Sequence, residues 1–307
     1  MRKAPKRFRA SEMLPEYDFS KGIRGKYAIW APLIDFQWAG LEWQIADDMW
    51  VRPGSAYREY EEFIEFKHAL SEEERERCRD AEHRLGLVHV GHDELSKQAK
   101  INSFLLALWI VRPTRTHVPF RFEVEKSGGR SVARILDRFQ WIRGQAEDEI
   151  KDQHLRKVGS ILPPLRAVFA ARRRLRNAVA LTFRGCVASE WQSAFICFSA
   201  AAEALLAYSR EPGLGDRLAE SYAKLVSASR SGEESAKDQF RRLYSIRSDI
   251  IHGRAYDYKD PNRNLTNLAD FSDILRRLWG AVLESEENRV ALEGDDKQRR
   301  SLFLKHL

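Results

Sequence analysis

The chain contains little cysteine and no long apolar run, and both shortages exclude classes of protein. Its 307 residues include 3 cysteines, Cys78, Cys186 and Cys197, which form no CxxC pair. This spacing indicates neither a zinc site nor a disulfide framework, and it is typical of reduced thiols. The longest clean apolar run, residues 104–111, is far too short to span a bilayer, and the basic N-terminus lacks the apolar stretch of a signal peptide. We expect a cytoplasmic protein without membrane contact.

Metal-ligand spacing is also missing. His83, His89 and His92 lie close together in the sequence, but no paired carboxylates or cysteines accompany them at the spacing of a zinc site. We expect these histidines to be surface or packed side chains. We expect no metal and no cofactor.

Acidic residues are outnumbered by basic ones. Lysine and arginine total 52 against 45 aspartates and glutamates, which gives a formal net charge of +7 at pH 7. This balance fits a polyanionic partner such as RNA, although many basic proteins bind no nucleic acid. Basic side chains gather in residues 1–10 and again at Arg172, Arg173, Arg174 and Arg176. Each group is usable for a phosphate backbone or is simply solvated.

The N-terminal half has mixed strand and helix patterns. Near-alternating aromatic and aliphatic residues over 33–51 predict two strands joined around Ala39 and Gly40. A second alternating stretch, 117–126, predicts a strand that ends at the turn Ser127-Gly128-Gly129. Apolar periodicity and capping residues predict helices at 57–70, at 71–85 with a capping box of Ser71 and Glu74, and from a cap at Asp93 to residue 111. We therefore expect an α+β domain over residues 29–160, preceded by an arm over 1–28.

The C-terminal half has helical patterns only. Pro163 and Pro164 follow a polar stretch, and we place the domain junction near them. The pattern beyond predicts an all-α bundle over 161–290 and a tail over 291–307. Helices are expected at 165–183, 190–208, 217–228, 233–252 and 267–286.

One of these helices carries a charged motif near its end. Arg247 and His252 lie five positions apart just before Gly253, and Ser231 with Glu234 supplies the capping-box spacing at the other end. Histidine exchanges a proton near neutral pH, and the arginine fork suits phosphate. The same spacing recurs from Arg84 to His89 and from Arg112 to His117, so the spacing alone is weak evidence. Of the three occurrences, only the one from Arg247 to His252 lies on a convincing helix with a stop signal.

The segment 243–253, which contains this motif, resembles the signature of HEPN domains, especially their ApeA-like branch. The resemblance continues at residues 200–206, which are similar to the glutamate-bearing helix of that family, and covers residues 165–284. It implies a HEPN-like α-helical bundle that acts as a metal-independent endoribonuclease, as a toxin or as an effector in bacterial antiviral defence. It also implies an RNA substrate, a homodimer with one cleft built from two protomers, and the site residues Arg247, His252, Ser248 and Glu203.

Elementary chemistry is consistent with these roles. The 2′-hydroxyl of RNA can attack the neighbouring phosphorus, so the protein needs a base, an acid and positive charge. His252 suits either proton-transfer role, Arg247 suits the charge, and Ser248 shares the helix face of His252. Five residues of helix turn through about 500°, which leaves Arg247 and His252 roughly 140° apart. Either a long arginine at the helix end or a second copy of the chain can close that gap.

Glu203 has two interpretations, because an unpaired carboxylate within an apolar run is unfavourable. It either orients His252 or Arg247, or it forms a buried ion pair with an arginine, and the two overlap. The alternative to catalysis is an inactive HEPN module that binds RNA or a partner protein.

A second and less specific resemblance lies near the N-terminus. The segment from Glu16-Tyr17-Asp18-Phe19-Ser20 to Tyr27 is similar to a peptide in small bacterial antitoxin-like proteins. It implies a possible antitoxin or regulatory partner. The alternative is an arm that docks its aromatic side chains against its own domain.

Overall fold

The computed structural model describes residues 27–54, 70–89, 95–125, 131–135, 149–170, 174–208, 212–227, 229–253 and 260–304. The chain forms two compact units. The first comprises Met1–Ile101, Thr114–Phe139 and Glu147–Gly159, and the second comprises Asn102–Pro113, Gln140–Ala146 and Ser160–Leu307. The division falls within helices α4 (Lys97–Val111) and α5 (Asp152–Ala170), which contribute residues to both units.

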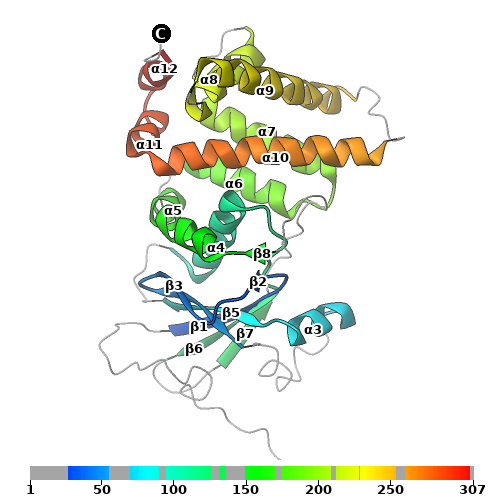
Figure 1. The fold of residues 1–307 in the computed structure, drawn as a ribbon, viewed down its shortest axis with the longest axis vertical. Helices are drawn as coiled ribbons and strands as arrows, with labels where there is room; N and C mark the ends of the chain where they lie inside the picture. The colour runs from blue at the N-terminus through cyan, green and yellow to red at the C-terminus, as the bar shows by residue number, and fades with distance from the viewer. Residues whose placement is uncertain are drawn as a thin grey trace, which may run out of the picture. The chain divides into compact units, whose positions relative to one another are not determined.

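The first unit is built on a 6-stranded antiparallel sheet with the strand order β3-β4-β5-β1-β6-β7 (Figure 1). Strand β1 (Tyr27–Leu33) lies between β5 (His83–His89) and β6 (Phe120–Glu125). Its consecutive residues Ile29, Trp30 and Ala31 are all buried, as expected for a central strand covered on both faces. The remaining strands are β3 (Trp43–Ala46), β4 (Met49–Pro53) and β7 (Ser131–Ile135).

The hairpin expected around Ala39 and Gly40 is wrong. The turn between paired strands β3 and β4 lies at Asp47 and Asp48 instead, and β2 (Gln37–Trp38) pairs in parallel with β8 (Glu149–Ile150). Gly40 allows the Trp38 ring to pack directly against the backbone, because a Cβ atom at this position would lie 2.1 Å from the ring. The same indole donates a hydrogen bond to Asp152 at 2.8 Å, so Trp38 is fixed on two sides.

Several predicted boundaries in this unit shift. Helix α3 (Glu72–Arg79) has the expected capping box of Ser71 and Glu74, but it ends before residue 85 because β5 begins at His83. Helix α4 begins at Lys97, where the Ser96 hydroxyl accepts the Ala99 N–H at 3.2 Å. Strand β6 begins at Phe120 rather than at residue 117. The helix expected at 57–70, the cap at Asp93 and the turn at 127–129 lie outside the described residues, apart from Leu70.

Tyr27 and Ala28, which the sequence places in the N-terminal arm, begin strand β1. The rest of that arm, including Glu16, Tyr17, Asp18, Phe19 and Ser20, lies outside the described residues. His83 is a packed histidine as expected, since it is buried, contacts Phe36 and Trp38, and has Nε2 at 3.0 Å from the Gly40 carbonyl oxygen.

The helix start expected at residue 165 is wrong, because Pro163 and Pro164 both lie inside the continuous helix α5. The two units divide within the same helix, between Gly159 and Ser160. Its buried face offsets the lost backbone donors, since residues at helical spacing are almost fully buried: Leu155, Val158, Ile161, Leu162 and Leu165. The single helix expected at 165–183 is the end of α5 and most of α6 (Arg174–Val187), with residues 171–173 outside the described ranges.

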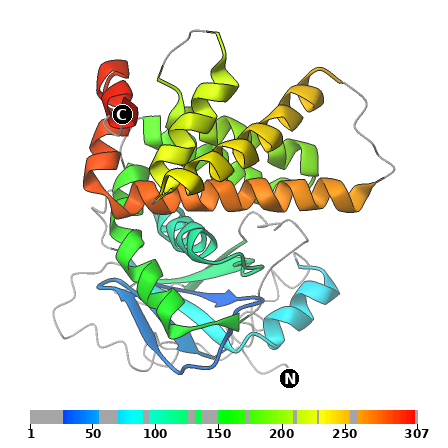
Figure 2. The same cartoon turned by 45° about the horizontal axis from the view of Figure 1, so that its top comes forward.

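The second unit is helical throughout its described part, so an N-terminal antiparallel sheet region followed by a mostly helical C-terminal region is confirmed. Figures 1 and 2 show the long helix α10 (Pro261–Glu284) running along α7 (Trp191–Leu206), with α8 (Leu214–Val226) beside α9 (Arg230–Ile251). The residues assigned to the end of the bundle and to a tail form α11 (Glu286–Glu293) and α12 (Asp296–Leu304). None of the helices in the described ranges is long and apolar enough to cross a membrane.

Helices α6 and α7 approach each other closely at Gly185. A Cβ atom at this position would lie 2.4 Å from two atoms of the Phe198 ring, and both residues are buried. Gly280, on α10, is a helical glycine with space around it, since a Cβ atom there would meet only a Glu284 carboxylate oxygen at 3.8 Å.

We predict that Gly185→Ala lowers the free energy of unfolding by about 1–3 kcal/mol, because the added methyl group overpacks the α6–α7 contact. Gly280→Ala is the control and should raise it by about 0.5–1 kcal/mol, because alanine loses less backbone entropy in a helix. Urea unfolding followed by circular dichroism measures both. Equal effects of the two substitutions would contradict the predicted contact.

Candidate functional site

The end of helix α9 presents the motif as the sequence predicts. Arg247 lies within the helix, His252 is its C-terminal cap, and Gly253 adopts a left-handed φ of 60°. The His252 N–H donates to the Ser248 carbonyl at 3.0 Å, and the Gly253 N–H donates to the Ile250 carbonyl at 3.2 Å. Glycine adopts this conformation without strain, so Gly253 ends the helix. The helix begins at Ser229, whose hydroxyl accepts the Gly232 N–H, so the capping box expected from Ser231 and Glu234 is wrong.

The other two arginine–histidine pairs with this spacing do not lie at the end of a helix. Arg84 and His89 both lie in strand β5, where no helix forms. Arg112 follows the end of α4, and His117 forms an isolated bridge with Ile34. The prediction that only the third occurrence lies on a helix is confirmed.

Glu203 reaches this motif from helix α7. Its neighbours Ala201, Ala202, Leu205 and Leu206 are buried, whereas the Glu203 side chain retains 22% exposure. Its Oε1 atom lies 2.7 Å from Arg247 Nε and accepts a hydrogen bond of 2.7 Å from the Tyr244 hydroxyl. The expected position of Glu203 near the motif is confirmed, and its partner there is Arg247.

The ion pair leaves most of the Arg247 guanidinium available. The closest contact is made by Nε, and the Nε–H does not point along it as in an aligned hydrogen bond. Among the described residues, neither terminal nitrogen of Arg247 forms a hydrogen bond, and Glu203 is the ion-pair partner of this side chain. The guanidinium also lies over the Tyr244 ring, with Cζ 5.7 Å from its centroid. The arginine is thus held at its base, while the fork that binds phosphates bidentately remains open.

Other arginines of α9 differ in this respect. Arg241 pairs with Asp216 at 2.7 Å and with Asp238 at 3.1 Å, and Arg242 pairs with Asp270 at 3.4 Å. These carboxylates are surface groups and neutralise the arginines locally. Arg247, at 30% exposure, combines a fixed position with an open fork.

His252 and Ser248 stand apart from this network. The His252 side chain is exposed, and within the described part of the chain it has neither a hydrogen bond nor an ion pair. Ser248 contributes its carbonyl oxygen to the helix end, and no side-chain contact joins it to His252 or Arg247. The fold of one chain therefore brings together Glu203 and Arg247, and leaves His252 and Ser248 at the exposed helix end.

Tyr244 is the member of the network that the sequence did not single out as a site residue. Burial raises the pKa of its hydroxyl well above the ordinary value, and the hydrogen bond to Glu203 raises it further. The hydroxyl therefore stays protonated at neutral pH and acts as a donor to the carboxylate. The only sequence signal is its position three residues before Arg247, which places the two on neighbouring parts of one helix face.

Metal ligands do not gather in the described ranges, where no group of three or more His, Cys, Asp and Glu side chains is placed to hold an ion. Comparison of the chain with protein-family models, with curated proteins and with solved structures found no match.

We predict that Tyr244→Phe and Glu203→Gln are coupled energetically. Each should lower the free energy of unfolding by about 1 kcal/mol, less than for a fully buried charged hydrogen bond because Glu203 is partly exposed. The double variant should lose less than the sum of the two, since Tyr244→Phe removes and Glu203→Gln weakens the same charge-assisted hydrogen bond. Urea unfolding of all four proteins gives the coupling.

The matched control is Tyr222→Phe. The Tyr222 hydroxyl is buried and has no hydrogen-bond partner within the described ranges, so its removal should be neutral or stabilising. Strict additivity of Tyr244→Phe with Glu203→Gln would argue against the network.

Proposed function

We propose that this protein is a HEPN-type, metal-independent endoribonuclease of the cytoplasm, acting in bacterial antiviral defence or in a toxin–antitoxin system. The observation that carries the proposal is the arginine held by Glu203 and Tyr244 with its fork open, together with an exposed histidine that ends the same helix. A fixed guanidinium can stabilise negative charge that develops on a phosphate, and a solvent-accessible imidazole can exchange protons with a substrate.

The proposed reaction needs no external nucleophile. A base removes the proton of the 2′-hydroxyl, the resulting oxygen attacks the adjacent phosphorus, and the bond to the 5′-oxygen breaks as that oxygen receives a proton. His252 takes one of the two proton-transfer roles. Arg247 donates its terminal N–H groups to the phosphate oxygens, and Glu203 fixes the direction of that fork. Ser248, one turn before His252, lies on the substrate side of the helix end.

A homodimer supplies the remaining geometry. Arg247 and His252 lie roughly 140° apart around one helix, so a single chain presents them in different directions. A second copy with its α9 end facing the first would place the histidine of one protomer near the arginine of the other. Ile251, beside His252, is a large apolar residue with 49% exposure and fits such a contact.

A non-catalytic module that binds RNA or a partner protein, such as an antitoxin, is the second candidate. One observation favours it: no described side chain forms a hydrogen bond or ion pair with the His252 side chain, whereas a catalytic histidine is usually oriented by a second group. In this case Arg247 would bind a phosphate without cleavage.

We predict that His252→Ala abolishes cleavage of RNA in the presence of EDTA, with the fold unchanged because the side chain is exposed. Loss of general acid–base help should reduce the rate by about 100-fold or more. Arg247→Lys should retain a small part of the activity, because an ammonium cannot replace the planar fork. Arg241→Lys, on the same helix but paired with surface carboxylates, is the control and should cleave like the parent.

Gel analysis of total RNA and circular dichroism of each variant measure these effects. If the parent binds RNA without cleaving it, the non-catalytic module is the correct account. Activity that disappears in EDTA and returns with magnesium would exclude the metal-independent mechanism.

We further predict that two inactive variants complement each other. In a heterodimer of Arg247→Ala and His252→Ala, one composite site retains both the intact arginine and the intact histidine. Mixing the two proteins under conditions that exchange protomers should restore part of the cleavage rate, while either variant alone stays inactive. No restoration in a proven heterodimer would mean that the two residues act within one chain.

A further inference from the structure

Helix α7 ends within one turn of Glu203, and the last carbonyl groups of a helix lack partners inside it. The helix stops at Leu206, and the Ala207 N–H donates to the Glu203 carbonyl at 2.9 Å. The position of Glu203 therefore depends on how this last turn is held.

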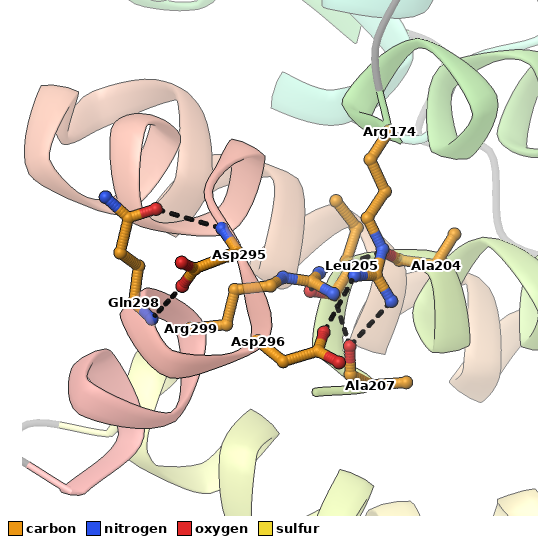
Figure 3. A network of polar contacts seen from close by, with 8 residues as sticks. All are labelled: Arg174, Ala204, Leu205, Ala207, Asp295, Asp296, Gln298 and Arg299. Atoms are coloured by element: carbon orange, nitrogen blue, oxygen red, sulfur yellow. Dashed lines mark hydrogen bonds and ion pairs between the residues drawn. The ribbon is translucent and has the colours of Figure 1, made fainter. Parts of the chain in front are cut away.

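A buried arginine from helix α12 holds the turn (Figure 3). Arg299 has 0% exposure, and its guanidinium donates to the carbonyl oxygens of Leu205 at 2.5 Å and Ala204 at 3.1 Å, and also to that of Ala207. Arg174, at the start of α6, donates to the same Ala207 oxygen at 2.8 Å. Two cations thus occupy the negative end of α7 and satisfy its free carbonyls.

The burial of Arg299 opposes its charge. The pKa of its guanidinium is lowered to about 10, first by burial and then by the nearby Arg174, while Asp296 and Glu293 act in the opposite direction. An arginine in such a place persists only where its hydrogen bonds compensate for the lost water. These bonds go to the turn that carries Glu203.

We propose that Arg299 is a positioning residue for the Arg247 site, an inference that rests on the function proposed above. The contacts form a continuous series. Arg299 on α12 fixes the last turn of α7, Glu203 in that turn fixes the base of Arg247 on α9, and Tyr244 fixes the Glu203 oxygen. The C-terminal helix, far from the motif in sequence, is part of the site.

The chain offers a matched control for this series. Arg276 on α10 also caps a helix end, since it donates to the carbonyl oxygens of Trp109 at 2.7 Å and Val111 at 3.1 Å, at the end of α4. Arg276→Lys removes the same kind of fork from a helix that does not carry Glu203. It therefore separates general loosening of a helix end from an effect on the site.

The test compares Arg299→Lys with Arg276→Lys, after circular dichroism has shown that each variant is folded. In ¹⁵N–¹H spectra of the arginine side chains, the Arg247 Nε signal is identified by its loss in Arg247→Lys. We expect Arg299→Lys to move this signal toward its position in Glu203→Gln and to speed hydrogen exchange of the Ala207 amide by about tenfold or more. Arg276→Lys should change neither. With RNA, kcat of Arg299→Lys should fall about tenfold while KM stays within about twofold.

Each outcome decides a separate question. An Arg247 signal that does not move in folded Arg299→Lys, or that moves equally in Arg276→Lys, overturns the positioning role whether or not RNA is cleaved. A signal that moves in a protein whose parent cleaves no RNA supports the positioning role and overturns only the proposed function. If Arg299→Lys does not fold, Arg174→Met removes only one donor to Ala207, and it should move the same signal in the same direction by a smaller amount.

Discussion

The candidate site depends on one carboxylate placed in an apolar helix. Glu203 interrupts a run of small and aliphatic residues on α7, where an unpaired charge would be strongly unfavourable. Only α9 supplies its partners among the described residues, through Tyr244 and Arg247. The rotation of α9 that turns Phe240 and Leu243 into the core is also the one that brings Tyr244 and Arg247 to Glu203. The same rotation directs the open side of Arg247 toward solvent.

Arg276 and Arg299 both satisfy the free carbonyl groups at the end of another helix. They come from α10 and α12, and each closes the end of a helix made much earlier in the chain. A guanidinium suits this task, because its several donors lie in one plane and can reach successive carbonyls. The helix ends of the unit are therefore satisfied by distant side chains as well as by local caps. This explains why residues with no evident sequence pattern, such as 296–304, are integral to the fold.

Helical periodicity and the stop signal at Gly253 were sufficient to predict α7, α9 and α10 and to place Arg247 and His252 correctly. The sequence predicts that the N-terminal region contains both strands and helices, but it does not predict which strands pair. Strand partners are set by long-range contacts, and the role of Gly40 is visible only once the Trp38 ring lies over it. The helix start predicted after Pro163 and Pro164 is wrong, because burial of the apolar face of α5 outweighs the low helix propensity of the two prolines. Tyr244 and Arg299 were missed because each takes its role from a partner on another helix.

The central place of β1 in the sheet has a consequence for the order in which the chain folds. Tyr27 pairs with His89 on one side and with Glu125 on the other. Strand β1 is therefore fully paired only after β5 and β6, which are synthesised much later, have been made. Such distant pairings slow folding, because a long loop must close before any contact forms. Until then both edges of an apolar strand remain open to other chains. A nascent chain released before β6 emerges would expose one edge of this strand, where it could pair with another chain.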